Sequence, residues 1–149
     1  MRALVQRVSS GAVNIPKKSY KKEIGKGMVI LLGVSEDDNV AEVNYVAEKC
    51  CNLRIFNDSN EKMNLSVKDI GGDVLIISQF TLYGDTKKGN RPSYNKAAKP
   101  LKARDLYNIF IKRIKNNLGE DKVKEGIFAA EMEVKIINDG PVTILVESK

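Results

Sequence analysis

The chain has 149 residues, of which 42% are hydrophobic and 30% charged, a globular composition that predicts one domain over 1–149. Its 25 basic and 19 acidic residues give a net charge of +6, which permits a polyanionic partner but does not establish one. The chain has no histidine, which excludes a Ser-His-Asp triad, a Cys-His pair and any His-ligated metal site.

The first part of the chain predicts strands. Ala3–Ser9 alternates loosely between apolar and polar residues, and Ala12–Ile15 is a short second strand. Pro16–Lys22 is polar and basic, which is typical of a mobile hairpin loop, and Met28–Val34 is a buried strand. Arg7 falls on a mostly apolar face, either as a snorkelling residue at an edge, which we favour, or as a pinned bidentate donor.

Nothing in the sequence indicates a membrane segment. Met28–Leu32 is the longest apolar run in the chain and is too short to cross a bilayer. No signal-peptide core follows Met1. We therefore expect a cytoplasmic protein with no membrane partner.

A first helix is predicted from a capping residue in Asp37–Asn39 to Asn52, because apolar residues recur between them at helical spacing. Cys50 and Cys51 are adjacent within this helix, so at least one of them is expected to be a small core residue. No Cys-x-x-Cys redox motif is present. Leu53–Phe56 is predicted to be the next strand.

The central stretch of the chain is Val74–Gly84. Its first four residues are apolar, which predicts a strand buried on both faces. Two hydroxyls and an amide then surround an aromatic ring in Ser78, Gln79, Phe80 and Thr81. On a continuing strand, Ser78 and Phe80 would face one way and the other two the opposite way. Buried polar groups need partners or a ligand, so this is either a strand end bonded to a neighbouring strand or a candidate catalytic stretch.

The segment after the central stretch combines a cationic loop with the longest helix. Residues 85–92 form a polar loop placed where a charged ligand would be held. Pro100 is predicted to start the helix and Gly119 to stop it. Phe128 follows this helix and is either a core residue, which the residues alone favour, or a stacking platform for a base.

The end of the chain predicts two strands, Met132–Ile137 and Val142–Val146, joined by Asn138–Pro141. Asp-Gly between two strands is typical of a tight hairpin turn. Pro141 is unusual there, because it removes a donor where pairing resumes, and its bond to Gly140 is a candidate cis peptide.

Together these elements predict an α/β fold with a curled, mostly antiparallel, barrel-like sheet and two main helices packed on one face. The many strands, the short connections and the wide separation of the two helices in sequence favour it. No Gly-x-Gly-x-x-Gly motif, Walker loop or internal repeat is present.

Two motifs resemble those of the D-aminoacyl-tRNA deacylase family. Ser78-Gln79-Phe80-Thr81-Leu82 resembles its Ser-Gln signature, and residues 138–143, Asn-Asp-Gly-Pro-Val-Thr, resemble its Asn-x-Gly-Pro-Val-Thr signature. The motifs occur in the family's order and start sixty residues apart. Leu4–Val8, Leu31–Val34 and Asn52–Phe56 are also similar, so the resemblance runs from residue 1 to about residue 147.

The resemblance implies the family's fold and its reaction. That reaction is hydrolysis of the ester joining a D-amino acid to the terminal adenosine of tRNA, and of glycine mischarged on tRNA(Ala), a chiral proofreading step in translation. It implies a homodimer with active sites at the interface and tRNA as the partner. We expect no DNA partner and no cofactor. No metal cluster is visible in the sequence, so no metal is expected either.

The resemblance also implies roles for individual residues. The Gly140–Pro141 bond would be cis, reach into the partner's pocket and face the substrate's α-amino group, leaving no space for an L side chain. Arg7 would hold this turn in place. The catalytic centre would comprise Ser78, Gln79, Phe80 and Thr81. The terminal adenine would be supported by Phe128 and Ala129.

The mechanism is open between two routes. Backbone N–H groups near Phe80 and Thr81 can supply an oxyanion hole. Thr81 is a candidate nucleophile, but no histidine is present to activate it, so we favour assistance by the 2′-hydroxyl of the terminal ribose. The competing functions are a non-catalytic tRNA- or RNA-binding module and a general serine or threonine esterase, which the missing histidine disfavours.

Overall fold

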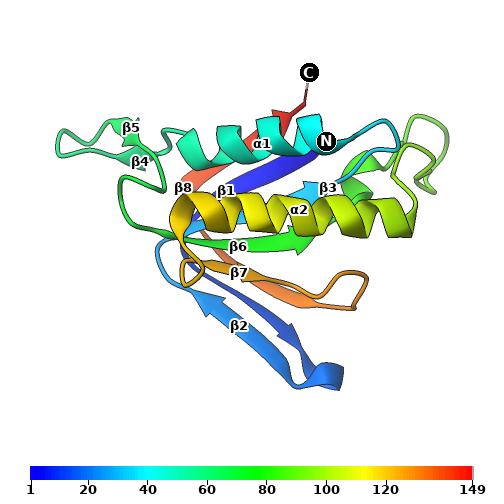
Figure 1. Ribbon diagram of the computed structural model, residues 1–149, viewed down its shortest axis with the longest axis horizontal. Helices are drawn as coiled ribbons and strands as arrows, with labels where there is room; N and C mark the ends of the chain where they lie inside the picture. Colours follow the sequence, from blue (N-terminus) through cyan, green and yellow to red (C-terminus); the bar gives the residue numbers. More distant parts are fainter. Residues whose placement is uncertain (149) are drawn as a thin grey trace.

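The computed structural model describes residues 1–148. Figure 1 shows two helices lying side by side across one face of a curled sheet. The helices are α1 (Val40–Asn52) and α2 (Pro100–Leu118). The strands of the main sheet are β1 (Arg2–Ile15), β2 (Tyr20–Ile24), β3 (Gly27–Gly33), β6 (Asp73–Ser78), β7 (Val123–Glu125) and β8 (Glu133–Glu147).

The main sheet is mixed. Its order is β2-β1-β3-β6-β7, with β8 paired to the other side of β1. β1 is antiparallel to β2, β3 and β8, whereas β3, β6 and β7 run parallel to one another. The predicted fold class is confirmed, because antiparallel pairings predominate and both helices cover the same face.

Two apolar clusters fill the two faces of the sheet. One joins α1 and α2 to the face that carries Val5, Ile30 and Ile76. The other surrounds Val29 and Leu75 on the opposite face, where partly buried side chains of β8 pack against it. Burial of each large aliphatic or aromatic side chain stabilises the fold by about 1.5–3 kcal/mol. The curl of the sheet therefore encloses a second core without a third helix.

The first 24 residues differ from their prediction. Ala3–Ser9 and Ala12–Ile15 belong to one strand, β1, because β8 pairs with β1 along both segments. Register shifts between Gln6 and Ser10 let the strand bend without ending. Pro16–Lys22 is not a loop throughout: a 3₁₀ turn, η1 (Pro16–Lys18), leads directly into β2.

The first helix agrees with its prediction. Asn39 caps α1, with its side chain accepting a hydrogen bond from Ala41 N and Glu42 bonding back to Asn39 N. Cys50 and Cys51 are both buried in the core. Burial raises the pKa of Cys51 to about 11 and also raises that of Cys50, so neither thiol forms the reactive thiolate at neutral pH.

The predicted strand Leu53–Phe56 is wrong in extent. Only Phe56 and its successor form a strand, β4 (Phe56–Asn57), which pairs with β5 (Met63–Leu65) in a separate two-stranded sheet. The preceding Ile55 carbonyl instead accepts a hydrogen bond from Arg7 Nη1 at 2.8 Å. The second long helix is as predicted, from Pro100 to a stop at Gly119.

The predicted hairpin at the end of the chain is wrong. Met132–Ile137 and Val142–Val146 lie in one strand, β8, and both pair with β1 rather than with each other. Gln6 of β1 pairs with Thr143 of β8, and Val8 pairs with Asn138. Two residues along β1 therefore correspond to five residues along β8. The residues in between therefore bulge out of an otherwise continuous strand. The Gly140–Pro141 peptide in this bulge is cis.

Candidate active site

The polar residues of the central stretch follow directly on the end of β6. Gln79 N donates to Leu32 O at 2.8 Å, and the chain then turns into a 3₁₀ helix, η2 (Phe80–Tyr83). The strand predicted from the apolar run that starts at Val74 is confirmed as β6, and it ends at Ser78. The expected alternation of side chains from Ser78 to Thr81 does not hold, because the partner strand β3 ends at Gly33.

Gly33 permits η2 to pack closely on the end of β3. A Cβ atom at Gly33 would lie 3.1 Å from Gln79 O and 3.2 Å from both Leu82 Cβ and Tyr83 Cε2. Only about one in ten Cβ contacts in proteins is this tight, so a larger residue would displace η2. The position of the candidate site thus depends on the absence of a side chain at this point.

The side chains of the Ser-Gln-Phe-Thr motif are accessible. Gln79 Nε2 donates a hydrogen bond to Thr81 Oγ1. The Phe80 side chain is 58% exposed, and its ring meets the ring of Tyr94 edge to face with centroids 4.9 Å apart. An exposed aromatic ring beside hydroxyl and amide groups offers a surface to a ligand rather than to the core.

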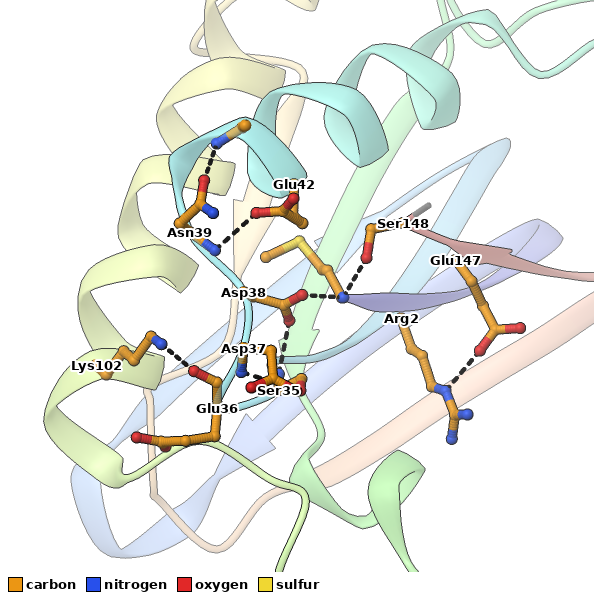
Figure 2. A network of polar contacts seen from close by, with 12 residues as sticks. Arg2, Ser35, Glu36, Asp37, Asp38, Asn39, Glu42, Lys102, Glu147 and Ser148 are labelled. Atoms are coloured by element: carbon orange, nitrogen blue, oxygen red, sulfur yellow. Dashed lines mark hydrogen bonds and ion pairs between the residues drawn. The ribbon is translucent and has the colours of Figure 1, made fainter.

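Arg2 fixes η2 from the far end of the chain. Its Nη1 donates to Leu82 O at 2.9 Å, and its guanidinium lies 4.8 Å from the centroid of the Tyr83 ring. Figure 2 shows the Arg2 side chain paired with Glu147, where Nε lies 2.7 Å from Oε1. Because Arg2 and Glu147 face each other on β1 and β8, η2 is held against the main sheet.

Phe128 and Ala129 lie near the same end of β6. β7 pairs in parallel with β6, and Gly126 N donates to Ile76 O at 2.9 Å, so the residues after β7 leave the sheet beside the end of β6. The Phe128 ring is partly buried, and its centroid lies 5.9 Å from that of the Tyr107 ring. The Arg104 guanidinium lies 5.5 Å from the centroid of the Phe128 ring. Ala129 is exposed and has a positive φ of 59°.

The candidate site therefore occupies the carboxyl edge of the parallel strands β3, β6 and β7. In open sheets with parallel strands, ligands bind outside the carboxyl ends of the strands. The structure brings together the predicted residues Ser78–Thr81 and Phe128–Ala129 at this edge. The other predicted residues, Arg7, Gly140 and Pro141, lie elsewhere in this chain.

Arg7 lies at the opposite end of the strands and anchors the bulge of β8. It pairs across β1–β3 with Met28, near the start of β3. The Arg7 side chain is nearly buried. Its Nε donates a hydrogen bond to the main-chain O of Asp139 at 3.2 Å and forms an ion pair with Asp139 Oδ2 at 3.1 Å. With the bond to Ile55, these contacts make Arg7 the pinned donor, and the favoured snorkelling interpretation is wrong.

The bulge is held from both sides. Asn138 Nδ2 donates to Arg7 O at 2.9 Å and to Val142 O at 3.1 Å. Gly140 has a φ of +124°, and a Cβ atom there would lie 2.8 Å from Val142 Cγ2 and 3.0 Å from Arg7 Nη2. This conformation and this space require glycine.

Within one chain the two motifs do not meet. Arg2 contacts η2 and Arg7 contacts the bulge, so the two contact points are five residues apart on β1. At about 3.3 Å per residue this is a separation of roughly 16 Å along the strand. Gly140 and Pro141 are exposed in the bulge near the middle of β8, and Phe80 and Thr81 are exposed at the carboxyl edge of β3 and β6.

Comparison with known proteins decides the family. Residues 4–147 match the model of the D-Tyr-tRNA(Tyr) deacylase family. The chain is 52% identical to a D-aminoacyl-tRNA deacylase of Flavobacterium psychrophilum, covering 100% of this chain and 98% of that protein. It is 53% identical to one of Thermosipho africanus, with the same coverage.

The chain belongs to the D-Tyr-tRNA(Tyr) deacylase family. The resemblance drawn from the two motifs is confirmed, and the chain is an enzyme of this family of hydrolases. Solved structures agree on the fold. One called c-Myc DNA Unwinding Element Binding Protein has a TM-score of 0.93 at 38% identity, covering 100% of this chain and 99% of its own. A probable eukaryotic D-amino acid tRNA deacylase has a TM-score of 0.83 at 16% identity over 98% of both chains.

Three residues of this deacylase-family site were missed by sequence reasoning. Arg2, Gly33 and Tyr94 each contact the Ser-Gln-Phe-Thr motif or η2. Arg2 and Tyr94 lie outside the stretches that resemble the family, and Gly33 lies in one of them without a role assigned to it. Each contacts the site through the fold rather than through sequence proximity. Only Tyr94 carried a signal, as an aromatic residue shortly after the cationic loop.

No helix among residues 1–148 is long and apolar enough to span a membrane.

Proposed function

We propose that the protein hydrolyses the ester bond between a D-amino acid and the terminal adenosine of tRNA, releasing the free amino acid and the tRNA. The observation that carries this proposal is the accessible Ser78–Thr81 motif at the carboxyl edge of the parallel strands. It occurs in a chain whose relatives at 52% and 53% identity are named D-aminoacyl-tRNA deacylases. An enzyme with this substrate works where translation occurs, in the cytoplasm.

The chemistry needs an oriented water and stabilisation of the oxyanion, because an ester is already an activated acyl group. Phe80 and Thr81 are the first two residues of η2. Their backbone N–H groups have no hydrogen-bond partner within the helix, because the first N–H groups of a helical turn lack one. They are suited to receive the oxyanion. Gln79 donates its amide N–H to Thr81 Oγ1, and an amide cannot take up the hydroxyl proton. We therefore assign activation of water to the 2′-hydroxyl of the terminal ribose.

Selection of handedness is assigned to the Gly140–Pro141 bulge of a partner subunit. Within one chain this bulge lies roughly 16 Å along β1 from the contacts of η2. In a homodimer with the sites at the interface, the bulge of one subunit can reach the Ser78 edge of the other. Its carbonyl groups would bind the substrate's α-amino group and leave no room for an L side chain.

Two features of the substrate follow from this arrangement. The main chain of the bulge excludes any L side chain by steric conflict. Glycine has no side chain, so glycyl-tRNA is expected to be hydrolysed as well. The terminal adenine is assigned to the surface around Phe128 and Ala129, where Arg104 lies over the Phe128 ring. D side chains would point to solvent, which suits an enzyme that accepts many of them.

The test is a comparison of D-tyrosyl-tRNA with L-tyrosyl-tRNA, each incubated with the purified protein with and without a metal chelator. We expect rapid release of D-tyrosine, little release of L-tyrosine and no effect of the chelator. Equal rates for the two substrates, or no hydrolysis of either, would contradict the proposal.

The second candidate is a non-catalytic nucleic-acid-binding module. It is favoured by the net charge of +6 and by the name of the structural relative at 38% identity, a DNA unwinding element binding protein. This module would bind tRNA with a strong dependence on salt and leave the ester intact. The same assay separates the two, because only the enzyme releases tyrosine.

A further inference from the structure

The positive charge of the chain is concentrated in one segment. Residues 85–105 contain seven basic and two acidic residues, which is five of the six net positive charges. The basic residues are Lys87, Lys88, Arg91, Lys96, Lys99, Lys102 and Arg104. We call residues 85–105 the cationic segment. The rest of the chain is almost neutral, so the protein presents its charge asymmetrically.

These seven side chains are not neutralised by the protein. Among residues 1–148, none of them takes part in an ion pair. All but Lys102 are exposed. The basic hairpin of β1 and β2 differs, because Lys17 lies 3.0 Å from Glu131 Oε2 and Lys21 lies 2.7 Å from Glu23 Oε1. Unpaired cations gathered on one segment are suited to a polyanion.

The cationic segment is fixed beside the candidate active site. It begins directly after η2, and its Asp85 and Ser93 exchange two backbone hydrogen bonds of 2.7 and 2.9 Å. Further along, Ala98 N donates to Val34 O at 2.9 Å, after the end of β3. Figure 2 shows Lys102 donating to the carbonyl of Glu36 in the loop before α1. The second half of the segment is thereby tied to the loop between β3 and α1, and its first half follows η2 along the chain.

Aromatic rings link the charge to the site. Tyr94 of the cationic segment meets Phe80 of the Ser-Gln-Phe-Thr motif with ring centroids 4.9 Å apart, and both rings are exposed. Single-stranded nucleic acids are bound by cations that follow the phosphates and aromatic rings that stack on bases. Here the two kinds of group are contiguous, and they continue into the site itself.

We propose that the cationic segment binds the phosphate backbone of the tRNA acceptor stem and 3′ strand, while the terminal adenosine occupies the active site. This inference rests on the proposed function, and it names the part of the substrate that the segment contacts. The occupant is RNA leading to the esterified 3′ end, because the basic residues begin at Lys87, four residues after the end of η2. Tyr94 and Phe80 together form a platform for an unpaired base of that strand.

The variant that tests this surface is the triple substitution Lys87→Ala, Lys88→Ala and Arg91→Ala. All three side chains are exposed, so the fold does not depend on their packing. Losing three phosphate contacts should weaken binding of uncharged tRNA by about 10- to 100-fold near 0.1 M salt. It should also reduce the slope of log K against log[salt] by about 2–3. Binding is measured by filter retention over a range of salt concentrations.

The matched control removes the same charge from elsewhere on the surface. Lys18, Lys22 and Lys26 are exposed and make no ion pair within residues 1–148. The triple substitution Lys18→Ala, Lys22→Ala and Lys26→Ala should keep tRNA affinity and salt slope within about two-fold of the parent, because these residues lie outside the cationic segment. An equal loss in both triple variants would mean that only net charge matters, which would overturn the proposal.

Substrate length separates stem binding from damage to the site. With D-tyrosyl-tRNA, the Lys87, Lys88 and Arg91 triple variant should raise KM with kcat little changed. With D-tyrosyl-adenosine, which lacks the stem phosphates, the KM of the triple variant should equal that of the parent. A loss of the same size on both substrates would place the effect in the site and overturn the proposal.

A DNA duplex with the sequence of the acceptor stem serves as the competitor that tests the choice of RNA. We expect it to displace tRNA less well than an RNA stem of the same sequence. Equal competition would make the surface a general polyanion site and refute the assignment. The binding measurements use uncharged tRNA, so they remain decisive for the surface even if the protein hydrolysed no ester, an outcome that would refute the proposed function alone.

Discussion

The hydroxyl of Thr81 accepts a hydrogen bond from Gln79 Nε2, and no histidine exists anywhere in the chain to act as its base. A serine or threonine without a base is a weak nucleophile near neutral pH. The side chain of Thr81 is exposed, so its removal leaves no buried gap. The backbone N–H of Thr81, which we assign to the oxyanion, is unaffected by substitution of the side chain.

We therefore expect Thr81→Ala to keep kcat/KM for D-tyrosyl-tRNA within about ten-fold of the parent. Loss of an activated nucleophile would cost several orders of magnitude, because chemical steps that depend on one proton transfer already change about 10²- to 10⁴-fold. Single-turnover hydrolysis measures the chemical step directly. Thr81→Ser is the control, and a collapse in Thr81→Ala with rescue by serine and intact tRNA binding would establish Thr81 as the nucleophile.

Among the secondary-structure elements, β8 shows how pairing with a neighbouring strand overrides a local sequence pattern. Asp-Gly-Pro between two alternating segments favours a hairpin, but both segments pair with β1, so the turn becomes a bulge. Arg7 is the residue of β1 that holds this bulge, by bonds to Asp139 and to Ile55 O. The position of Gly140 and Pro141 therefore depends on a guanidinium that bridges two elements.

Arg7→Lys should loosen this bulge, because one ammonium group cannot reproduce the fork of contacts made by Nε and Nη1. Leaving nearly buried carbonyl groups unpaired should reduce the free energy of unfolding by about 1–3 kcal/mol, measured by urea denaturation. The ratio of D- to L-tyrosyl-tRNA hydrolysis should also fall. Arg54→Lys, at an exposed arginine whose Nε donates to Asn64 O at 2.8 Å, should change stability by less than about 0.5 kcal/mol. Unchanged selectivity in folded Arg7→Lys would argue against the bulge as the selecting element.

The elements that sequence predicted well are those specified by their own residues. The apolar run that starts at Val74, the capped helix after Asn39 and the long helix after Pro100 were all placed correctly. The errors lie where a distant partner decides. β6 stops at Ser78 because β3 ends opposite it, and Leu53–Ile55 pairs with no strand in the part of the chain that the structure describes. These pairings join residues far apart in sequence, so no local window contains them.

The candidate site was predicted in its motifs but not in its arrangement. Both motifs were found from sequence, and Ser78–Thr81 lies with Phe128 and Ala129 at one edge of the sheet. The alternation expected of a continuing strand does not apply beyond Ser78, because η2 replaces the strand. Arg2 and Tyr94 reach η2 through tertiary contacts between residues that are not part of either motif.

For the molecule as a whole, the separation of the two motifs favours an assembly of two chains. β8 lies at an edge of the main sheet, and within residues 1–148 it pairs only with β1. Exposed apolar side chains occur along it, at Ile137, Ile144 and Leu145. Long exposed edge strands with apolar side chains are sites at which another chain pairs or packs. A two-fold dimer would use such a surface from both subunits.

Subunit mixing tests whether each site takes its parts from two chains. Gln79→Ala impairs the first motif, and Gly140→Ala distorts the bulge, because a Cβ there would lie 2.8 Å from Val142 Cγ2. Each variant alone should be nearly inactive. If sites are shared, a heterodimer has one site with both motifs intact and one with both impaired. Random exchange makes half of the dimers heterodimers, so the mixture should regain about one quarter of the parental activity.

The outcome is decided by recovery on mixing and by the size of the particle. Sedimentation equilibrium should give a dimer for the parent and for both variants, and circular dichroism should confirm that each variant is folded. Leu145→Glu, at a side chain that is 49% exposed, should shift the equilibrium toward monomers and reduce activity in parallel, because burying an unpaired charge at an interface is costly. Dimers that exchange subunits without regaining activity would mean that one chain supplies the whole site. The bulge held by Arg7 would then act on something other than the substrate's chiral carbon.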